Sequence, residues 1–390
     1  MTKRLETQLI HAGEPRPRIA GAAAVPIFQS TVFECAAGDD YHDIRYPRLS
    51  NLPNHDVLNG KIAALEGGEA ALVTASGMAA IATTLMTIAE DGGHVLVQDG
   101  LYGGTHGLLD NDLPALGISH DTLDAADPAS WAARIRPNTR AILVEAIANP
   151  LLTVIDHRAV VEFAKAHSIT SIIDATFATP VNFRPLDLGY DLCLHSATKY
   201  LNGHSDVVAG AVVGRGDLVR RIKLRLDHLG GSLDPHACFL LYRGLRTLAV
   251  RMRYQNQSAG EVAAFLERRD EVERVLYPGL SSHPQHALAA ELFSGFGGML
   301  SFVPVGGEVA AEALLSALEL PMQGPSLGGV ETLVSIPARV SHAEFSDDDL
   351  ARVGLPKSLI RMSVGLEATE DLLDDLDVGL RAAAAVGGGR

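Results

Sequence analysis

Short apolar runs alternate with helical segments along most of this chain. The runs are rich in β-branched residues, have the length of buried strands, and span residues 71–76, 95–98, 141–145, 171–173 and 192–194. Residues 56–66 place apolar side chains on one helical face, residues 79–89 form an apolar helical stretch, and Asp156 is positioned to cap a helix through His167. Strands and helices that alternate at this spacing predict a mostly parallel sheet wrapped by helices.

The pattern changes near residue 246. A helical segment at 248–266 is followed by a strand at 298–303 and a helix at 308–318, which predicts a smaller α/β domain. The first 50 residues are rich in proline and lack periodicity, so we expect an extended arm that contacts a neighbouring subunit. The expected parts are an arm at 1–50, a large domain at 51–245 and a small domain at 246–390, whose low-complexity tail, AAAAVGGGR, frays.

Composition excludes several classes of protein. At 390 residues the chain exceeds one typical core, and 47% hydrophobic with 20% charged residues is typical of a globular enzyme. The net charge of −15 argues against nucleic acid and anionic membrane as partners. No apolar run is long enough to span a membrane, and the first residues lack the apolar stretch of a signal peptide.

Cysteine and histidine usage narrows the picture further. Cys35, Cys193 and Cys238 are an odd number and widely spaced, which predicts free thiols in a reducing cytoplasm. The 15 histidines are scattered and form no HExxH motif, and the chain has no paired CxxC motifs. We therefore expect no metal site.

The strongest chemical signal lies between residues 171 and 203. Asp174 ends one predicted strand, and the next apolar run is followed by Ser196, Thr198 and Lys199. A carboxylate and a lysine placed in this way can face opposite sides of one bound ring. Pyridoxal phosphate requires a lysine that forms a Schiff base, an acid facing the pyridine nitrogen, and hydroxyls for the phosphate. A surface lysine beside a strand end is the ordinary alternative, so the rest of the chain has to decide.

Three other places fit the same cofactor. Ser76-Gly77-Met78 lies where a strand turns into a helix, and backbone N–H groups there favour a phosphate. Tyr102 follows the next strand, so its ring either lies on a cofactor face or is a half-buried loop tyrosine. Asn149, in an Asn-Pro turn, either offers an amide to a ring oxygen or only forms the turn.

Taken together, these residues resemble the trans-sulfuration, or Cys/Met-metabolism, family of pyridoxal-phosphate enzymes. The resemblance covers nearly the whole chain and follows the family's order of motifs. The matching blocks are YPR at Tyr46, LEGGEAALVTASGMAAI at Leu65, LYGGT at Leu101, DATFATP at Asp174, HSATKYLNGHSD at His195, RGLRTL at Arg243, YPGL at Tyr277, GFGGMLSF at Gly295, SLGGVETL at Ser326 and LIRMSVGLE at Leu359.

The resemblance implies an α/β protein of fold type I for pyridoxal-phosphate-dependent transferases, with the cofactor held in the domain at 51–245. Lys199 would form the Schiff base and then move protons, and Asp174 would keep the pyridine nitrogen protonated. Tyr102 would stack on the ring and act at the leaving group. The phosphate would be held by Ser76, Gly77, Met78, Ser196 and Thr198, and by Tyr46 and Arg48 of the neighbouring subunit.

On the substrate side, the resemblance implies that Arg361 clamps the α-carboxylate, as guanidinium geometry allows. Asn149 and Ser326 would line the same side, and Tyr46 would reach it from the neighbouring subunit. The active site would then need a homodimer, or a homotetramer made of two such dimers.

The implied activity is γ-elimination from a homocysteine- or homoserine-derived amino acid, as in cystathionine γ-lyase or methionine γ-lyase, giving a 2-oxo acid, ammonia and a thiol. γ-Replacement, as in cystathionine γ-synthase, is the first alternative, and an aminotransferase or a non-catalytic descendant used for binding are alternatives of other classes. Four positions depart from the family's usual residues, so neither lyase subfamily matches cleanly: Gly104, Gly107, Ala175 and Pro325.

Overall fold

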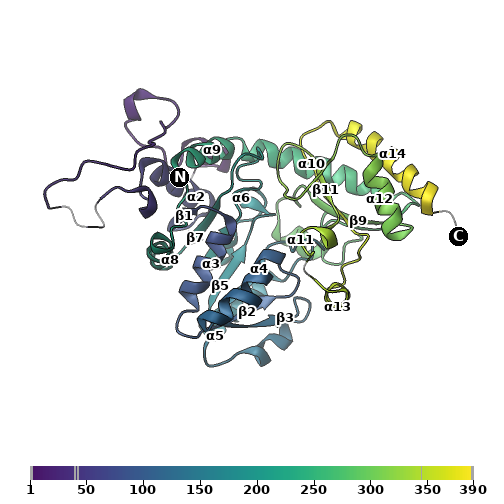
Figure 1. Ribbon diagram of the computed structural model, residues 1–390, viewed down its shortest axis with the longest axis horizontal. Coiled ribbons are helices and arrows are strands. Elements are labelled where there is room, and N and C mark those ends of the chain that lie inside the picture. The colour runs from purple at the N-terminus through teal and green to yellow at the C-terminus, as the bar shows by residue number, and fades with distance from the viewer. Residues whose placement is uncertain (1–2, 39–40, 42–43, 344, 388–390) are drawn as a thin grey trace.

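The computed structural model describes residues 3–38, 41, 44–343 and 345–387. Two sheets dominate it, one built from residues before 215 and the other from residues after 271 (Figure 1). The α/β class predicted from the sequence is confirmed.

The larger sheet has seven strands in the order β1-β7-β6-β5-β4-β2-β3. Only β7 runs antiparallel to its neighbours, so the predicted mostly parallel sheet is confirmed. The strands are β1 Ala70–Thr74, β2 His94–Gln98, β3 Ser119–Leu123, β4 Thr139–Glu145, β5 Thr170–Asp174, β6 Leu192–His195 and β7 Gly210–Gly214.

Helices cover both faces of this sheet because successive strand residues point to opposite sides. Leu72 of β1 and Ile172 of β5 belong to the core under α3 and α8, whereas the next residues, Val73 and Ile173, pack towards α2 and α5. The helices of this part are α2 Pro53–Glu66, α3 Gly77–Ile88, α4 Gly103–Gly107, α5 His157–His167, α6 Thr179–Asn182, α7 Pro185–Leu188, α8 Gly216–Leu229 and α9 Pro235–Leu245.

Local signals in the sequence set several of these boundaries. The Asp156 carboxylate accepts hydrogen bonds from the backbone N–H groups of Arg158 and Ala159, so α5 begins where predicted. α2 ends at Glu66 and is capped by Gly67, which has φ +75°, a conformation that glycine adopts at little cost.

The smaller sheet has five strands in the order β10-β11-β12-β9-β8 and packs against the long helices of the C-terminal part. The strands are β8 Val272–Leu276, β9 Met299–Pro304, β10 Met322–Gln323, β11 Leu333–Ser335 and β12 Ile360–Ser363. The helices are α10 Leu248–Glu267, α11 His286–Leu292, α12 Gly307–Ala317, α13 Asp347–Arg352 and α14 Thr369–Gly387. The predicted helices at 248–266 and 308–318 and the strand at 298–303 are confirmed within one residue at each end.

The two chain ends differ from the expectation. Residues Leu5–His11 form helix α1, which packs on α2, because Leu5 and Leu9 lie one helical turn apart and face the core. The buried Lys61 amine donates to the Leu9 carbonyl at 2.9 Å and ties α1 down. At the other end, α14 extends to Gly387, packs along α12 and buries Ala383 in the core of the C-terminal part, so the alanines of the tail continue the helix; residues 388–390 lie outside the described residues.

Much of the chain between α1 and α2 extends away from the seven-stranded sheet (Figure 1). We propose that the boundary between the large and small domains lies at the start of α10, as the sequence pattern indicates. One hydrophobic core nevertheless joins the two parts, since Met299 and Leu359 belong to the same buried cluster as Ile173. Within the described residues, no helix has the length and apolarity needed to cross a membrane.

Candidate active site

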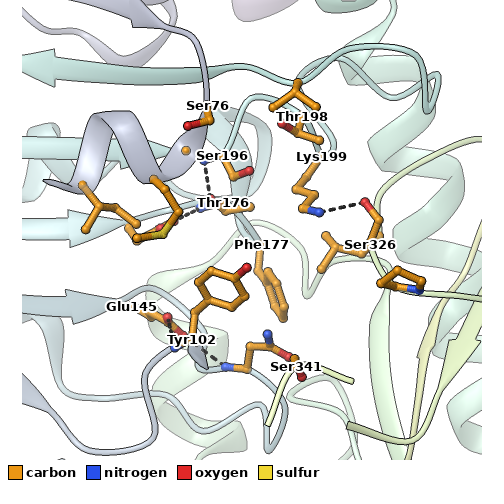
Figure 2. A pocket seen from close by; sticks show the side chains of 18 of the residues that line it. Ser76, Tyr102, Glu145, Thr176, Phe177, Ser196, Thr198, Lys199, Ser326 and Ser341 are labelled. Atoms are coloured by element: carbon orange, nitrogen blue, oxygen red, sulfur yellow. Dashed lines mark hydrogen bonds between the residues drawn. The ribbon is translucent and has the colours of Figure 1, made fainter. Parts of the chain in front are cut away.

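A cavity of about 540 Å³ opens where β4, β5 and β6 end (Figure 2). The carboxyl ends of parallel strands meet at one edge of a sheet, so residues distant in the sequence converge there. The C-terminal part closes the cavity on the opposite side. The predicted site residues that line it are Ser76, Gly77, Met78, Tyr102, Asn149, Asp174, Ser196, Thr198, Lys199, Ser326 and Arg361.

Lys199 lies in the turn that follows β6, and its side chain crosses the cavity. Its Nζ donates a hydrogen bond to Ser326 Oγ at 2.7 Å (Figure 2). Burial and, secondarily, the charge of Arg361 lower the pKa of Lys199 to about 8. The free-amine fraction at neutral pH is therefore much larger than for an exposed lysine, as nucleophilic attack on a carbonyl requires.

Arg361, on β12, faces Lys199 from the C-terminal part. Its two terminal nitrogens donate to Asn149 Oδ1 at 3.1 Å and to the Ser326 carbonyl at 3.0 Å. Burial lowers the pKa of Arg361 to about 10, which leaves the guanidinium charged at neutral pH. Ser326 has φ +88°, an uncommon conformation for a residue with a side chain, and such strain clusters at functional sites.

Asp174 ends β5 at the base of the cavity. Burial raises the pKa of its carboxyl, while the Thr176 side chain and backbone N–H oppose this shift, the N–H donating to Oδ1 at 2.9 Å. The charge of His195 also lowers the pKa of Asp174, and His195 Nε2 lies 2.6 Å from Glu66 Oε1. A half-buried carboxyl of this kind suits a cationic partner.

The beginning of α3 forms another wall. Ser76 Oγ accepts the hydrogen bond of the Ala79 N–H at 3.0 Å, and the preceding N–H groups of the helix have no intrahelical acceptor. A Cβ on Gly77 would come within 2.8 Å of Ser196 Cβ, so only glycine lets α3 lie this close to the end of β6. The junction thus presents N–H groups and the hydroxyl-bearing Ser196 and Thr198 to one region of the cavity.

Tyr102 stands between β2 and α4, and its ring extends into the cavity (Figure 2). The neighbouring Gly104 leaves room for the ring in this position, because a Cβ there would lie 2.6 Å from Tyr102 Cε1 and the ring would have to shift. The Tyr102 N–H donates to Glu145 Oε1 at 2.7 Å.

Glu145 is a cavity residue that the sequence did not single out. It ends β4 and pairs in register with Asp174 on β5, so two carboxyls stand side by side. Burial first, and then the charge of Asp174, raise the pKa of Glu145 to about 8. Its signal in the sequence was its place at the end of an apolar strand, the same signal that identified Asp174.

Tyr46 and Arg48 do not line the cavity of their own chain. Arg48 donates to the Asp227 carbonyl at 2.8 Å and to the Tyr41 hydroxyl at 3.0 Å, and its guanidinium lies 5.6 Å from the centre of the Tyr46 ring. This separation accords with the expectation that both residues serve a neighbouring subunit.

Two of the residues that depart from the family's usual pattern, Pro325 and Gly107, have different surroundings in the structure. Pro325 lines the cavity, whereas a Cβ on Gly107 would meet only the Asn111 side chain, at 4.0 Å. One buried group of possible metal donors, Glu66, Cys193 and His195, lies among the described residues, next to the strand end that carries Ser196. The expectation of no metal site stays a prediction.

Comparison with known proteins agrees with this geometry. A family model described as Cys/Met metabolism PLP-dependent enzyme matches residues 6–381. The chain belongs to this family. Its cofactor is therefore pyridoxal phosphate (PLP).

The chain is similar to members with different activities. It is 41% identical to a cystathionine gamma-lyase of Bacillus subtilis, over 95% of this chain and 97% of that protein. It is 40% identical to an L-methionine gamma-lyase of Pseudomonas putida, over 97% of each. The crystal structure of a cystathionine gamma synthase from Xanthomonas oryzae pv. oryzae, in complex with aminoacrylate and cysteine, superposes with a TM-score of 0.94 at 38% identity, covering 99% of this chain and 100% of that one.

The cavity of this family member fits its cofactor. The amine of lowered pKa, the half-buried Asp174 and the N–H groups at the start of α3 lie around one space, as an aldehyde, a pyridine nitrogen and a phosphate require. The chain therefore holds a PLP enzyme's donor set in one place, with Tyr46 and Arg48 outside it.

Proposed function

We propose that this enzyme catalyses γ-elimination from a homocysteine- or homoserine-derived amino acid whose γ-substituent is uncharged. The reaction breaks the Cγ–S or Cγ–O bond. It consumes one water and gives a 2-oxo acid, ammonia and the free thiol or acid of the leaving group. Methionine and O-acetyl-homoserine belong to this class of substrate, whereas cystathionine carries a distal carboxylate and ammonium.

The charge distribution of the cavity carries this proposal. Among the lining residues within the described part of the chain, the acidic and basic side chains are Glu145, Asp174, Lys199 and Arg361. The cofactor and the α-carboxylate of an amino acid account for Asp174, Lys199 and Arg361, and a pKa of about 8 leaves Glu145 mostly uncharged at neutral pH. The remaining wall is largely apolar and includes Ile147, Phe177, Val208, Pro325 and Val340. A distal charge would lose hydration there without a partner from this chain, at a cost of about 1–3 kcal/mol.

Each catalytic role follows from a position. Bound PLP supplies an electrophilic carbonyl and an electron-withdrawing ring. The Lys199 amine would hold that carbonyl and, once free, would take the proton from Cα and return it to another carbon. Asp174 would keep the ring nitrogen protonated, and Arg361 with Asn149 would orient the substrate carboxylate. The Tyr102 hydroxyl would protonate the departing sulfur or oxygen, and the start of α3 with Ser196 and Thr198 would bind the phosphate.

Steady-state assays with L-methionine, O-acetyl-L-homoserine and L-cystathionine test the proposal, with 2-oxo acid, ammonia and free thiol as readouts. We expect kcat/KM for the best uncharged substrate to exceed that for cystathionine by about tenfold or more. Lys199→Ala is expected to lower turnover by about 10³-fold or more. Release of no 2-oxo acid from any of the three substrates would refute γ-elimination, and a preference for cystathionine would refute the assignment of substrate class.

A charge added to the wall provides a matched test. Pro325→Glu is expected to shift the ratio of kcat/KM towards cystathionine, because the new carboxylate can pair with the distal ammonium. Pro284 is exposed and is not part of the cavity lining, so Pro284→Glu is the control and is expected to leave the ratio unchanged.

γ-Replacement is the second candidate, since a cystathionine gamma synthase structure is similar over the whole chain. A cavity without a site for a charged nucleophile favours water and elimination. Formation of cystathionine from O-acetyl-L-homoserine and L-cysteine, faster than release of 2-oxo acid, would favour replacement instead.

The active form in this proposal is a homodimer, or a homotetramer made of two dimers, in the cytoplasm. The position of Tyr46 and Arg48 outside their own cavity supports the oligomer. The described cysteines are free thiols, which supports the compartment.

A further inference from the structure

Glu145 has contacts that none of the roles above uses. Its side chain is buried, with 7% of the residue exposed, and its carboxyl group lies below the Tyr102 ring in the cavity wall (Figure 2). The strand that carries it is fixed in turn, because the Glu145 N–H donates to Oε1 of the buried Gln98 at 3.0 Å. The carboxyl is therefore held at a defined place between two loops.

Each oxygen of this carboxyl accepts a hydrogen bond from a different loop. Oε1 accepts from the Tyr102 N–H at 2.7 Å, after β2, and Oε2 accepts from the Asn149 N–H at 3.1 Å, after β4. The Asn149 side chain then accepts from Arg361 at 3.1 Å. One carboxyl thus links the backbone that carries the Tyr102 ring to the pair formed by Asn149 and Arg361.

Only a carboxyl group can make this link at Glu145. A carboxyl retains acceptor capacity on both oxygens, whether or not it carries a proton. A glutamine in the same place has one oxygen and one NH₂ group, and the NH₂ group would face a backbone N–H. One of the two loops would then lose its acceptor and move.

We propose that Glu145 is a positioning residue that sets the distance between the Tyr102 ring and the clamp formed by Asn149 and Arg361. The proposal builds on the proposed function, since Tyr102 faces the cofactor ring and the clamp faces the substrate carboxylate. Glu145 itself neither transfers a proton nor binds the substrate. Glu145 affects where the Tyr102 ring lies relative to the substrate carboxylate. A misplacement of about 1 Å in such an arrangement can lower the reaction rate by about 10²-fold.

The first test uses ligands that bind without turnover. L-Norvaline and L-norvalinamide have no leaving group at Cγ and differ in the carboxylate that Arg361 would bind. Titration of the PLP-loaded enzyme with each, followed by the visible absorption and circular dichroism of the bound cofactor, gives two dissociation constants. We expect wild type to prefer the acid, and Glu145→Gln to lower that preference by about tenfold while retaining the cofactor.

The matched control is Glu69→Gln. Glu69 is exposed and also accepts a backbone N–H, that of Gly216 at 2.8 Å, but it is not part of the cavity lining. Glu69→Gln is expected to keep the wild-type preference. An unchanged preference and unchanged circular dichroism in Glu145→Gln would overturn the proposal.

The second test needs no cofactor. Hydrogen exchange of the cofactor-free protein reports the Tyr102 and Asn149 amides directly, and we expect faster exchange at one or both in Glu145→Gln but not in Glu69→Gln. If Glu145→Gln does not fold, Glu145→Asp decides. Aspartate keeps both oxygens but is shorter by one methylene, so exchange at wild-type rates for both amides would overturn the proposal. A wild-type enzyme that releases no 2-oxo acid would refute the proposed function and leave the exchange result standing.

Discussion

At the scale of single residues, the site depends on groups whose properties are set by their surroundings. Lys199 shows this best, because burial and the Arg361 charge act on its amine in the same direction. Asp174 and Glu145 are shifted the other way, since burial favours the neutral form of an acid. The pKa values of Lys199, Asp174 and Glu145 are therefore all shifted in the direction that favours the uncharged form.

The contribution of Arg361 to Lys199 can be measured without turnover. In the cofactor-free protein, the rate of Lys199 acylation against pH, read by mass spectrometry of the peptide, should have a midpoint near the pKa of about 8. Arg361→Met removes the smaller of the two causes, so we expect the midpoint to rise, but not to the ordinary value because burial remains. Arg352→Met, which removes an exposed arginine, is the control. An unchanged midpoint in Arg361→Met would contradict the electrostatic explanation.

Much of the site was predictable at this scale because strand ends are visible in a sequence. Asp174 and Lys199 each follow an apolar run. A carboxylate and an amine in this arrangement are typical of a pyridoxal-phosphate site. Glu145 ends a run in the same way, yet its role depends on two backbone N–H groups, and backbone donors leave no trace in residue identity. The φ of +88° at Ser326 is equally invisible, since serine is not a residue that signals this conformation.

At the scale of elements, the junction of β1 with α3 determines how close two parts of the site come. α3 begins at Gly77, and Ser196 follows β6 directly, so this one glycine sets the approach of the helix to the strand end. The strand-to-helix turn was predicted from its pattern. The contact across the sheet between residues 77 and 196 was not, because it depends on the order of strands.

Gly77→Ala should therefore weaken cofactor binding more than it weakens the fold. The added Cβ would meet Ser196 Cβ at 2.8 Å and push the N–H groups at the start of α3, which we propose bind the phosphate, away from the strand end. We expect the dissociation constant for pyridoxal phosphate to rise about tenfold, and the free energy of unfolding to fall by about 1–3 kcal/mol.

The control for this prediction is Gly216→Ala. Gly216 is the first residue of α8, and a Cβ there meets only the Glu69 side chain, at 3.4 Å. Equilibrium dialysis and urea unfolding measure the two quantities. Equal cofactor affinity in Gly77→Ala and wild type would show that the close approach of α3 is not needed for binding.

The ends of the chain show the limits of pattern at this scale. Helix α1 is only 7 residues long. Its two core-facing apolar positions, Leu5 and Leu9, are too few to give a recognisable helical periodicity in the proline-rich N-terminal segment. The prediction that the C-terminal tail frays was wrong for its alanines, because alanine-rich sequence is low in complexity but also favours helix. Packing against α12, which the sequence does not display, lets α14 continue.

At the scale of the whole molecule, the position of Tyr46 and Arg48 makes the single chain incomplete in our proposal. Both residues resemble phosphate ligands of the family, yet they lie beside α8 and away from their own cavity. If each cavity draws them from a partner, two inactive chains can complement each other.

Subunit exchange tests this arrangement. Lys199→Ala lacks the reactive amine and Arg48→Ala lacks the donated guanidinium, so each homodimer is expected to be strongly impaired. A hybrid dimer has one cavity with both defects and one with neither. Random reassociation of equal amounts should then restore about a quarter of wild-type activity. Recovery no greater than the sum of the separate variants would contradict a shared site.

The side-by-side ending of β4 and β5 has a consequence beyond catalysis. Two acids at adjacent strand ends disfavour each other's ionisation, and the charge of Asp174 contributes to the raised pKa of Glu145. In our proposal, the protonated ring nitrogen of bound PLP would pair with Asp174 and offset this effect. The cofactor would then stabilise the ends of these two strands electrostatically as well as supply the chemistry of the reaction.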